Sequence, residues 1–480
     1  MSVLVIDVGT SGVRAAVVLP DATVAAERHE RLLPDTPFPG LVEFDAVRLA
    51  DVAVELARSV LADAGPVKAV GVANQRASAV VWDRATGEPV GPGIGWQDLR
   101  TVGECLALQA EGLRLMPNQS ATKIAHLLDA ADPGRTRDLC VGTVDSWLVW
   151  RLTEGTHHVT DVGNAAVTGM LHGDASGWNP RVLELLRIPA DALPVLVDSS
   201  GPVGAATVLP GAPPISGIAG DQQASLIGQA CVRPGMAKIT FGTGGMLDVW
   251  LGPDRPTFSE RGPGGTFPIV TARRAGVISW GLEAIMLSAG SNVEWLRDDL
   301  GVIATAEESH RIAATCSDTG GVVYVPALFG LGTPRWDYGA RGGLFGVTRG
   351  TGRAELVRAV LEGVAHRGAD LVEAAETDAG IAIERLRIDG GMSANPTFVQ
   401  ALADATGRAV ELSPMLEATT LGAAFLAGLG SGLLESDDDL EALWRPRGLV
   451  EPRRQLDRAR WAEAVDRASA WHGDLSALSF

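Results

Sequence analysis

Lysine is scarce in this 480-residue sequence, which contains only Lys68, Lys123 and Lys238. None of them follows a glycine, so the Gly-Lys-Ser/Thr segment with which a P-loop holds nucleotide phosphates is absent. The HExxH helix of zinc peptidases, the HRD and DFG triplets of protein kinases and the GxSxG turn of α/β-hydrolases are missing as well. These absences exclude several common enzyme classes.

Cysteine and long apolar runs are scarce too. The four cysteines form no CxxC pair, so we interpret them as buried small side chains in a reducing compartment. The sequence begins without a basic region followed by an apolar stretch, and no apolar run reaches about 18 residues. We therefore expect a cytoplasmic protein with no membrane insertion. Residues 421–434 come closest to a membrane segment, and we interpret them as a buried helix.

Positive charge is in deficit, with 40 Lys and Arg against 58 Asp and Glu and a net charge of −18. Such a field repels phosphate backbones and anionic lipids, so we expect no nucleic-acid partner. A nucleotide remains allowed, because backbone N–H groups can hold its phosphates locally. Hydrophobic residues make up 46% of the chain, and its length favours two or three globular domains.

Glycine, by contrast, is abundant, and two glycine-rich turns divide the sequence. The apolar run 3–6 and the alternating pattern that resumes after residues 9–12 (GTSG) predict a β-hairpin. A dinucleotide-binding turn would lead into a helix instead, which disfavours a nicotinamide oxidoreductase. Residues 237–252 repeat the hairpin pattern around a turn at 242–245, half the chain away. Either the two halves are similar domains with phosphate-sized turns, which we favour, or the glycine-rich composition repeats the turn by chance.

Strand and helix patterns alternate along the rest of the chain, as is typical of an α/β fold. We expect an amphipathic helix at 143–153, a strand followed by a helix over 213–230, a buried strand at 386–391 and a long helix at 354–376. Asn395 and Pro396 predict the start of a further helix, and the 436–480 region predicts one closing helix with loops.

Three charged residues near these elements could perform phosphoryl-transfer chemistry. Arg14 could place its guanidinium over a transferring phosphoryl group, or could be an exposed strand residue. Asp7 ends a buried strand, where a carboxylate needs either a magnesium ion or backbone N–H groups. Asp221 starts a helix after a buried strand and could accept the proton of an attacking hydroxyl, or simply cap the helix. Gln222, Trp96 and residues 74–76 add the aromatic face and dense hydrogen bonding that polyols require.

Five segments of the sequence resemble the FGGY carbohydrate kinase family, and in particular its glycerol-phosphorylating members. They are residues 74–101, 145–155, 158–170, 219–245 and 386–407, and the resemblance extends from residue 1 to about residue 434. It implies an α/β, actin-like ATPase fold with two ribonuclease H-like domains around a central cleft. The first, 1–232, would contain the substrate site and the first phosphate motif, and the second, 233–480, the second phosphate and adenosine motifs. ATP and Mg²⁺ are the implied cofactors, a small polyol or sugar is the implied substrate, and a homodimer is left open.

The resemblance also implies a role for individual residues. Asp221 matches the catalytic base, and Asp7 and Asp221 match the carboxylates near magnesium. The polyol contacts match Arg76, Trp96, Asp221 and Gln222. The nucleotide contacts match Thr10, Ser11, Gly12, Arg14, Thr243, Gly290, Gly391 and Asn395.

Four positions depart from the glycerol-phosphorylating pattern. Ala77 stands where that pattern has Glu, Asn118 where it has Tyr, Met246 where it has an aromatic residue and Glu294 where it has Gln. We predict an ATP-dependent kinase for a terminal hydroxyl, with glycerol as the best-matched substrate. A longer polyol or a ketose such as xylulose is the alternative, because Ala77 and Asn118 open space. An actin- or chaperone-like ATP-driven binding module is a further alternative, which the polyol-type cluster disfavours.

Overall fold

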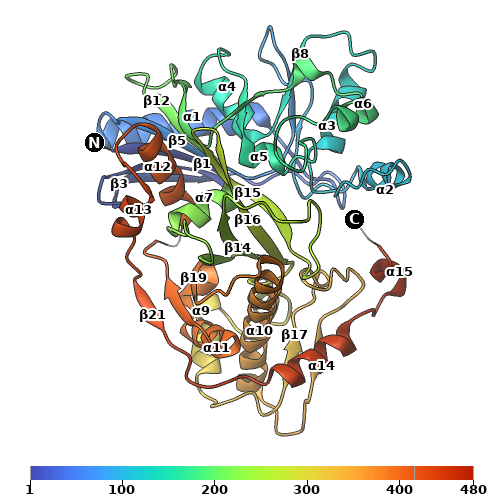
Figure 1. Ribbon diagram of the computed structural model, residues 1–480. Coiled ribbons are helices and arrows are strands. Elements are labelled where there is room, and N and C mark those ends of the chain that lie inside the picture. Colours follow the sequence, from blue (N-terminus) through green and yellow to red (C-terminus); the bar gives the residue numbers. More distant parts are fainter. Residues whose placement is uncertain (1, 416, 479–480) are drawn as a thin grey trace.

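A computed structural model describes residues 2–415 and 417–478 of the protein (Figure 1). Within these residues thirteen strands form one continuous sheet in the order β21-β20-β19-β13-β14-β16-β15-β11-β12-β5-β1-β2-β3. Helices cover this sheet, so the α/β expectation is confirmed. The strands of the sheet are β1 (Val3–Val8), β2 (Gly12–Val18), β3 (Val24–Arg31), β5 (Ala69–Asn74), β11 (Ser200–Ala205), β12 (Pro214–Gly220), β13 (Ala237–Phe241), β14 (Gly245–Gly252), β15 (Phe267–Arg274), β16 (Val277–Met286), β19 (Arg385–Asp389), β20 (Ala409–Leu412) and β21 (Gly448–Val450).

Shorter strands pair outside this sheet, and the helices connect the strands. The short strands are β4 (Glu43–Phe44), β6 (Val80–Asp83), β7 (Gly93–Ile94), β8 (Leu139–Gly142), β9 (Val159–Asp161), β10 (Val195–Val197), β17 (Val323–Val325) and β18 (Gly343–Phe345). The helices are α1 (Ala46–Ala64), α2 (Val102–Ala110), α3 (Ala121–Ala131), α4 (Val144–Leu152), α5 (Val162–Ala166), α6 (Pro180–Leu186), α7 (Asp221–Gly228), α8 (Ser291–Glu294), α9 (Ala306–Ala313), α10 (Arg353–Ala379), α11 (Pro396–Thr406), α12 (Ala418–Gly430), α13 (Asp437–Leu443), α14 (Arg458–Ala468) and α15 (Gly473–Ser476), with single turns η1 (Ala190–Ala192), η2 (Trp295–Asp299) and η3 (Gly391–Ala394).

The two halves of the large sheet have the same topology. In the first half the order is β3-β2-β1-β5-β12, with β1 antiparallel to β2 and parallel to β5. In the second half the order is β16-β14-β13-β19-β20, with β13 antiparallel to β14 and parallel to β19. Both expected hairpins are present, and the repeated topology confirms the expected internal duplication. The boundary between residues 232 and 233 stays a prediction.

Each half sends one helix across to the other half. Helix α7 follows β12 and α12 follows β20, so the two helices hold equivalent places in the repeat. They cross at glycines: a Cβ on Gly228 would lie 1.9 Å from the Ala418 carbonyl oxygen, and one on Gly422 would lie 1.7 Å from that of Ala224. Only glycine permits this approach, which brings the start of α7 against the strands of the second half. Figure 1 shows α12 beside β12 and α7 above β14.

Local signals place several elements as expected. Asn395 caps α11 by accepting a hydrogen bond from the Phe398 N–H, Pro396 is its first residue, and Gly407 ends it with φ +67°. The helices over 354–376 and 421–434 are α10 and α12, and the strand–helix unit over 213–230 is β12 and α7. No helix of the described residues is long and apolar enough to cross a membrane.

Two expectations were wrong. Helix α4 is not amphipathic: eight of its nine residues are buried, because Trp82 and the first-half sheet pack around it. The described part of the 436–480 region, residues 436–478, does not form one closing helix. Instead, α13, β21, α14 and α15 follow one another, and β21 extends the sheet by pairing with β20.

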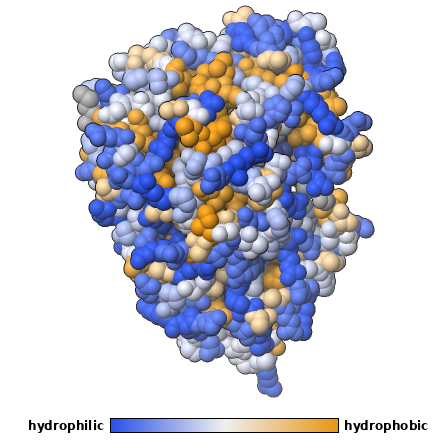
Figure 2. Space-filling view, viewed as in Figure 1, coloured by the Kyte–Doolittle hydropathy of each residue, from blue (hydrophilic) through white to orange (hydrophobic). Residues whose placement is uncertain are grey.

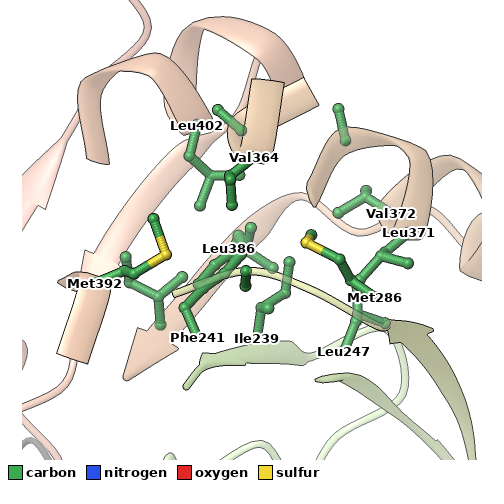
Figure 3. Packing of buried hydrophobic residues seen from close by; sticks show 14 of the residues in the cluster. Ile239, Phe241, Leu247, Met286, Val364, Leu371, Val372, Leu386, Met392 and Leu402 are labelled. Atoms are coloured by element: carbon green, nitrogen blue, oxygen red, sulfur yellow. The ribbon is translucent and has the colours of Figure 1, made fainter. Parts of the chain in front are cut away.

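Large apolar clusters lie in both halves, and a further cluster contains residues of both. In the second half, Phe241 and Leu247 from the sheet face Val364 and Leu371 from α10 (Figure 3). The Phe241 ring also meets that of Phe398 edge to face, at 4.8 Å between centroids. Cys105, Cys140 and Cys231 are buried and Cys316 is half-buried, all as free thiols. Figure 2 shows a face on which apolar patches are interrupted by hydrophilic residues.

Candidate active site

The first glycine turn contacts the aromatic residue expected at the polyol site. The Gly9 N–H donates to the Gly12 carbonyl at 2.9 Å, closing the turn between β1 and β2. Thr10 Oγ1 accepts a hydrogen bond from Trp96 Nε1 at 3.0 Å, and the Trp96 N–H donates to Ser78 Oγ at 3.0 Å. The structure therefore brings Thr10 and Trp96 together, while Ser11 is exposed at the tip.

The second glycine turn rests on the loop that precedes α8. The Gly290 N–H donates to the Gly242 carbonyl at 2.9 Å, and the Ala289 N–H donates to the Thr243 carbonyl at 2.8 Å. A Cβ at Gly290 would lie 2.6 Å from the Gly242 oxygen, so this position needs glycine for packing. Thr243 is exposed, and its side chain is available to a ligand.

The two residues of the expected adenosine motif flank one turn: Gly391 begins η3, and Asn395 follows η3 as the cap of α11. Gly391 is exposed, and a Cβ there would meet nothing within 4 Å. Asn395 Nδ2 donates to Ser309 Oγ at 2.9 Å, in addition to the capping bond of its Oδ1. Both polar groups of the Asn395 side chain therefore already have hydrogen-bond partners in the protein, and a nucleotide contact there stays a prediction.

Asp221 stands at the first position of α7, directly after β12. Its Oδ1 accepts the Gln222 N–H at 2.8 Å and lies 3.5 Å from Arg76 Nε. Among the described residues no donor reaches Oδ2, and 30% of the side chain is exposed. Burial raises the pKa of Asp221, and the charge of Arg76 opposes that rise. The free oxygen can accept a proton from a hydroxyl group.

Arg76 links the two halves of the molecule at this point. It follows β5, and its Nη2 donates to Glu283 Oε2 of β16 at 2.6 Å. The same Nη2 lies 3.7 Å from Met246 Sδ at the start of β14. The side chains of Arg76 and Glu283 are 11% and 9% exposed, so water screens their attraction little.

Gln222 is oriented by a buried lysine of the second half. Lys238 Nζ donates to Gln222 Oε1 at 2.7 Å and to Thr240 Oγ1 at 2.9 Å. It also forms an ion pair with Asp248 at 2.8 Å, with both side chains fully buried. Because the amide oxygen of Gln222 is occupied by Lys238, its amide N–H groups remain for a substrate oxygen.

Asp7 lies in a strongly acidic environment. Burial and the charges of Asp221 and Glu417 raise the pKa of Asp7 to about 7, and the charge of Arg14 acts the other way. Arg14 itself is paired with Glu27 and lies 3.6 Å from Glu417. Neighbouring carboxylates whose negative charges Arg14 offsets only in part suit a divalent cation.

A magnesium ion would need further ligands here. No group of three His, Cys, Asp or Glu side chains in residues 2–415 and 417–478 is arranged to hold a metal. Mg²⁺ in phosphoryl-transfer sites is bound by one or two carboxylates together with substrate phosphates and water. Asp7 and Asp221 fit that arrangement.

The four residues that depart from the glycerol-phosphorylating pattern are also placed, and one of them, Glu294, is exposed at the end of α8. Ala77 is buried with φ +60°, and its carbonyl accepts Ser120 Oγ at 3.1 Å. Asn118 is exposed, and Met246 is half-buried beside Arg76. Lys123 donates to the carbonyls of Trp96, Pro117 and Gln119, which fixes the loop containing Asn118 to Trp96.

Sequence reasoning missed Glu283, Lys238 and Glu417. Glu283 and Lys238 form hydrogen bonds with two expected polyol contacts of the opposite half of the molecule, Arg76 and Gln222 respectively. The scarcity of lysine could have drawn attention to Lys238, which lies inside an apolar strand pattern. Glu283 and Glu417 had no comparable signal.

The repeated five-stranded topology, the crossed helices and the two glycine turns define an actin-like ATPase fold of two domains. Residues 2–228 match the N-terminal domain, and residues 237–431 the C-terminal domain, of the FGGY family of carbohydrate kinases. The chain belongs to this family and is an ATP-dependent phosphotransferase.

Individual relatives cover nearly the whole chain. A glycerol kinase of Trichlorobacter lovleyi is 42% identical over 98% of this chain and 99% of its own. A glycerol kinase of Aromatoleum aromaticum is also 42% identical, over the same shares. The solved structure of Plasmodium falciparum glycerol kinase with ADP has a TM-score of 0.90 at 28% identity, covering 97% of this chain and 98% of that one. A xylulose kinase of Rhodospirillum rubrum shares the fold, with a TM-score of 0.81 at 24% identity, covering 99% and 98%.

Proposed function

We propose that this protein transfers the γ-phosphoryl group of ATP to a terminal hydroxyl of glycerol. The relatives that are 42% identical are glycerol kinases, and they match the chain over almost its full length. The observation that carries the proposal is the free Oδ2 of Asp221, flanked by the fixed side chains of Arg76 and Gln222. ATP as the phosphoryl donor also fits the cytoplasmic location expected from the sequence.

In this mechanism Asp221 Oδ2 accepts the hydroxyl proton as the oxygen attacks the γ-phosphorus. The Arg76 guanidinium and the amide N–H groups of Gln222 donate to polyol oxygens, and Trp96 offers its ring to the carbon chain. These groups are held by Glu283, Lys238 and Thr10, so they need little reorganisation when substrate binds.

The nucleotide would lie along the two glycine turns. The backbone N–H groups near Thr10, Ser11 and Gly12 would hold one part of the phosphate chain, and Thr243 another. Arg14 would turn from Glu27 toward the transferring group and offset its charge. Mg²⁺, held by Asp7 and Asp221, would neutralise phosphate charge when bound. Gly290, Gly391 and Asn395 would border the adenosine.

The proposal is tested by measuring ADP release from the purified protein with ATP and magnesium over glycerol, erythritol, xylitol and xylulose. We expect the highest kcat/KM with glycerol and a product phosphorylated on a terminal carbon, identified by phosphorus NMR. Turnover with none of these alcohols would contradict the proposal. Sedimentation of the same sample tests the homodimer that the sequence leaves open.

A longer polyol or a ketose is the second candidate. It is favoured by the small Ala77, the exposed Asn118 and the flexible Met246, which stand where the glycerol-phosphorylating pattern has larger or more polar groups. A kcat/KM at least tenfold higher for erythritol, xylitol or xylulose than for glycerol would select it.

A further inference from the structure

A row of charged side chains crosses the sheet of the second half. Lys238 of β13 is in register with Asp248 of β14, which is in register with Glu283 of β16. In the other direction Lys238 is in register with Arg387 of β19, and Arg387 with Glu411 of β20. Residues in register on neighbouring strands point to the same face of a sheet. These five residues, the charged row, therefore face one side.

Within its own half of the molecule, the charged row has fewer basic than acidic side chains. It contains two basic and three acidic side chains, and Asp248 and Glu283 stand next to each other. Both are buried, where two neighbouring negative charges are costly without a cation. The missing cation comes from the first half, because Arg76 donates to Glu283 at 2.6 Å.

The same row holds a second side chain of the first half. Lys238, paired with Asp248, donates to the amide oxygen of Gln222 at 2.7 Å. The two expected polyol contacts Arg76 and Gln222 thus each receive their orientation from a charged residue on a strand of the opposite half. Arg76 also has Asp221 at 3.5 Å as a competing partner.

We propose that Glu283 is a positioning residue for the polyol site: it holds Arg76 across the interface between the halves and keeps the guanidinium from closing onto Asp221. Without Glu283, Arg76 would pair with Asp221 on both carboxylate oxygens and occupy the oxygen that must receive the hydroxyl proton. This inference rests on the proposed function, because it takes Arg76 as a substrate contact. It makes polyol binding depend on both halves being in contact at β16.

The test is Glu283→Gln, which keeps the shape and removes the charge, with Glu283→Asp as the conservative variant. The matched control is Asp437→Asn, which removes a carboxylate that Arg274 contacts at 2.7 Å, away from the site. For the alcohol on which the parent is most active, we expect Glu283→Gln to raise KM at least tenfold and to change KM for ATP less than twofold. Glu283→Asp should recover part of the loss, and Asp437→Asn should leave both KM values unchanged.

Two results would overturn the inference. One is a KM for the alcohol within twofold of the parent in Glu283→Gln, and the other is a parallel rise of both KM values, which would indicate a general structural role. If Glu283→Gln does not fold, the KM for the alcohol and the KM for ATP are compared in Glu283→Asp instead. A parent with no activity on any alcohol refutes the proposed function instead. In that case the pairing of Arg76 with Glu283 is tested separately. Non-additive effects of Arg76→Met and Glu283→Gln on the denaturant midpoint would confirm the pairing, and additive effects would refute it.

Discussion

Asp221→Asn removes a proton acceptor with little change in shape. The amide oxygen of the new side chain can keep the bond to the Gln222 N–H, so its NH₂ group takes the place of Oδ2 and donates where the carboxylate accepted. Arg76 retains Glu283 as a partner at 2.6 Å, so no buried charge is left alone and the fold should remain stable. General-base catalysis contributes roughly 10²- to 10⁴-fold, which corresponds to about 2.7–5.5 kcal/mol of activation free energy. We expect kcat to fall by that factor.

The assay is coupled ADP release at saturating ATP and alcohol, with ATP affinity measured separately by calorimetry. Asp51→Asn, on α1 and paired with Arg151, is the control for loss of a remote carboxylate. Because burial raises the pKa of Asp221, the kcat of the parent should decline toward acid at a higher pH than an exposed aspartate would give, and the variant should lose that decline. A variant kcat within tenfold of the parent would refute the assignment of Asp221 as the base.

Further substitutions test other parts of the site. Gly242→Val should weaken ATP binding in calorimetry without loss of stability, since a Cβ there meets nothing closer than 4.0 Å. Gly244→Val, by contrast, would bring its Cβ to 2.8 Å from the Met286 carbonyl oxygen and should lower the melting temperature. An unchanged ATP affinity in Gly242→Val would show that this turn does not bind the nucleotide. Ala77→Glu with Asn118→Tyr should raise kcat/KM for glycerol relative to xylitol by roughly tenfold to a hundredfold, at about 1 kcal/mol or more for each recovered hydrogen bond; a slower double variant on glycerol would mean that other groups replace these side chains. Lys238→Met should lower the free energy of unfolding by about 3–5 kcal/mol, because it leaves Asp248 buried without its cation, and a loss below about 1 kcal/mol in urea titration would contradict that account.

Local sequence signals predicted much of the fold and part of the site. The hairpins at both glycine turns, Asp221 at the junction of β12 and α7, and the cap of α11 at Asn395 all follow from patterns within ten residues of one another. Helix α4 shows where such signals fail. Its polar residues suggested an exposed face, but Trp147 packs against Trp82 at 5.3 Å between rings, so contacts from a distant strand bury the helix on nearly every side.

The sequence by itself determined the candidate residues for the chemistry: two phosphate-sized turns, one carboxylate at a strand–helix junction, and an arginine and a glutamine near an aromatic ring. These features are short-range, because periodicity, caps and turns depend on neighbouring residues. Only the tertiary structure decided which charges hold them. Arg76 meets Glu283 across 207 positions, and Ser225 meets Asp389 across 164. Such pairings depend on strand register and on the crossing of α7 and α12, which no local pattern encodes.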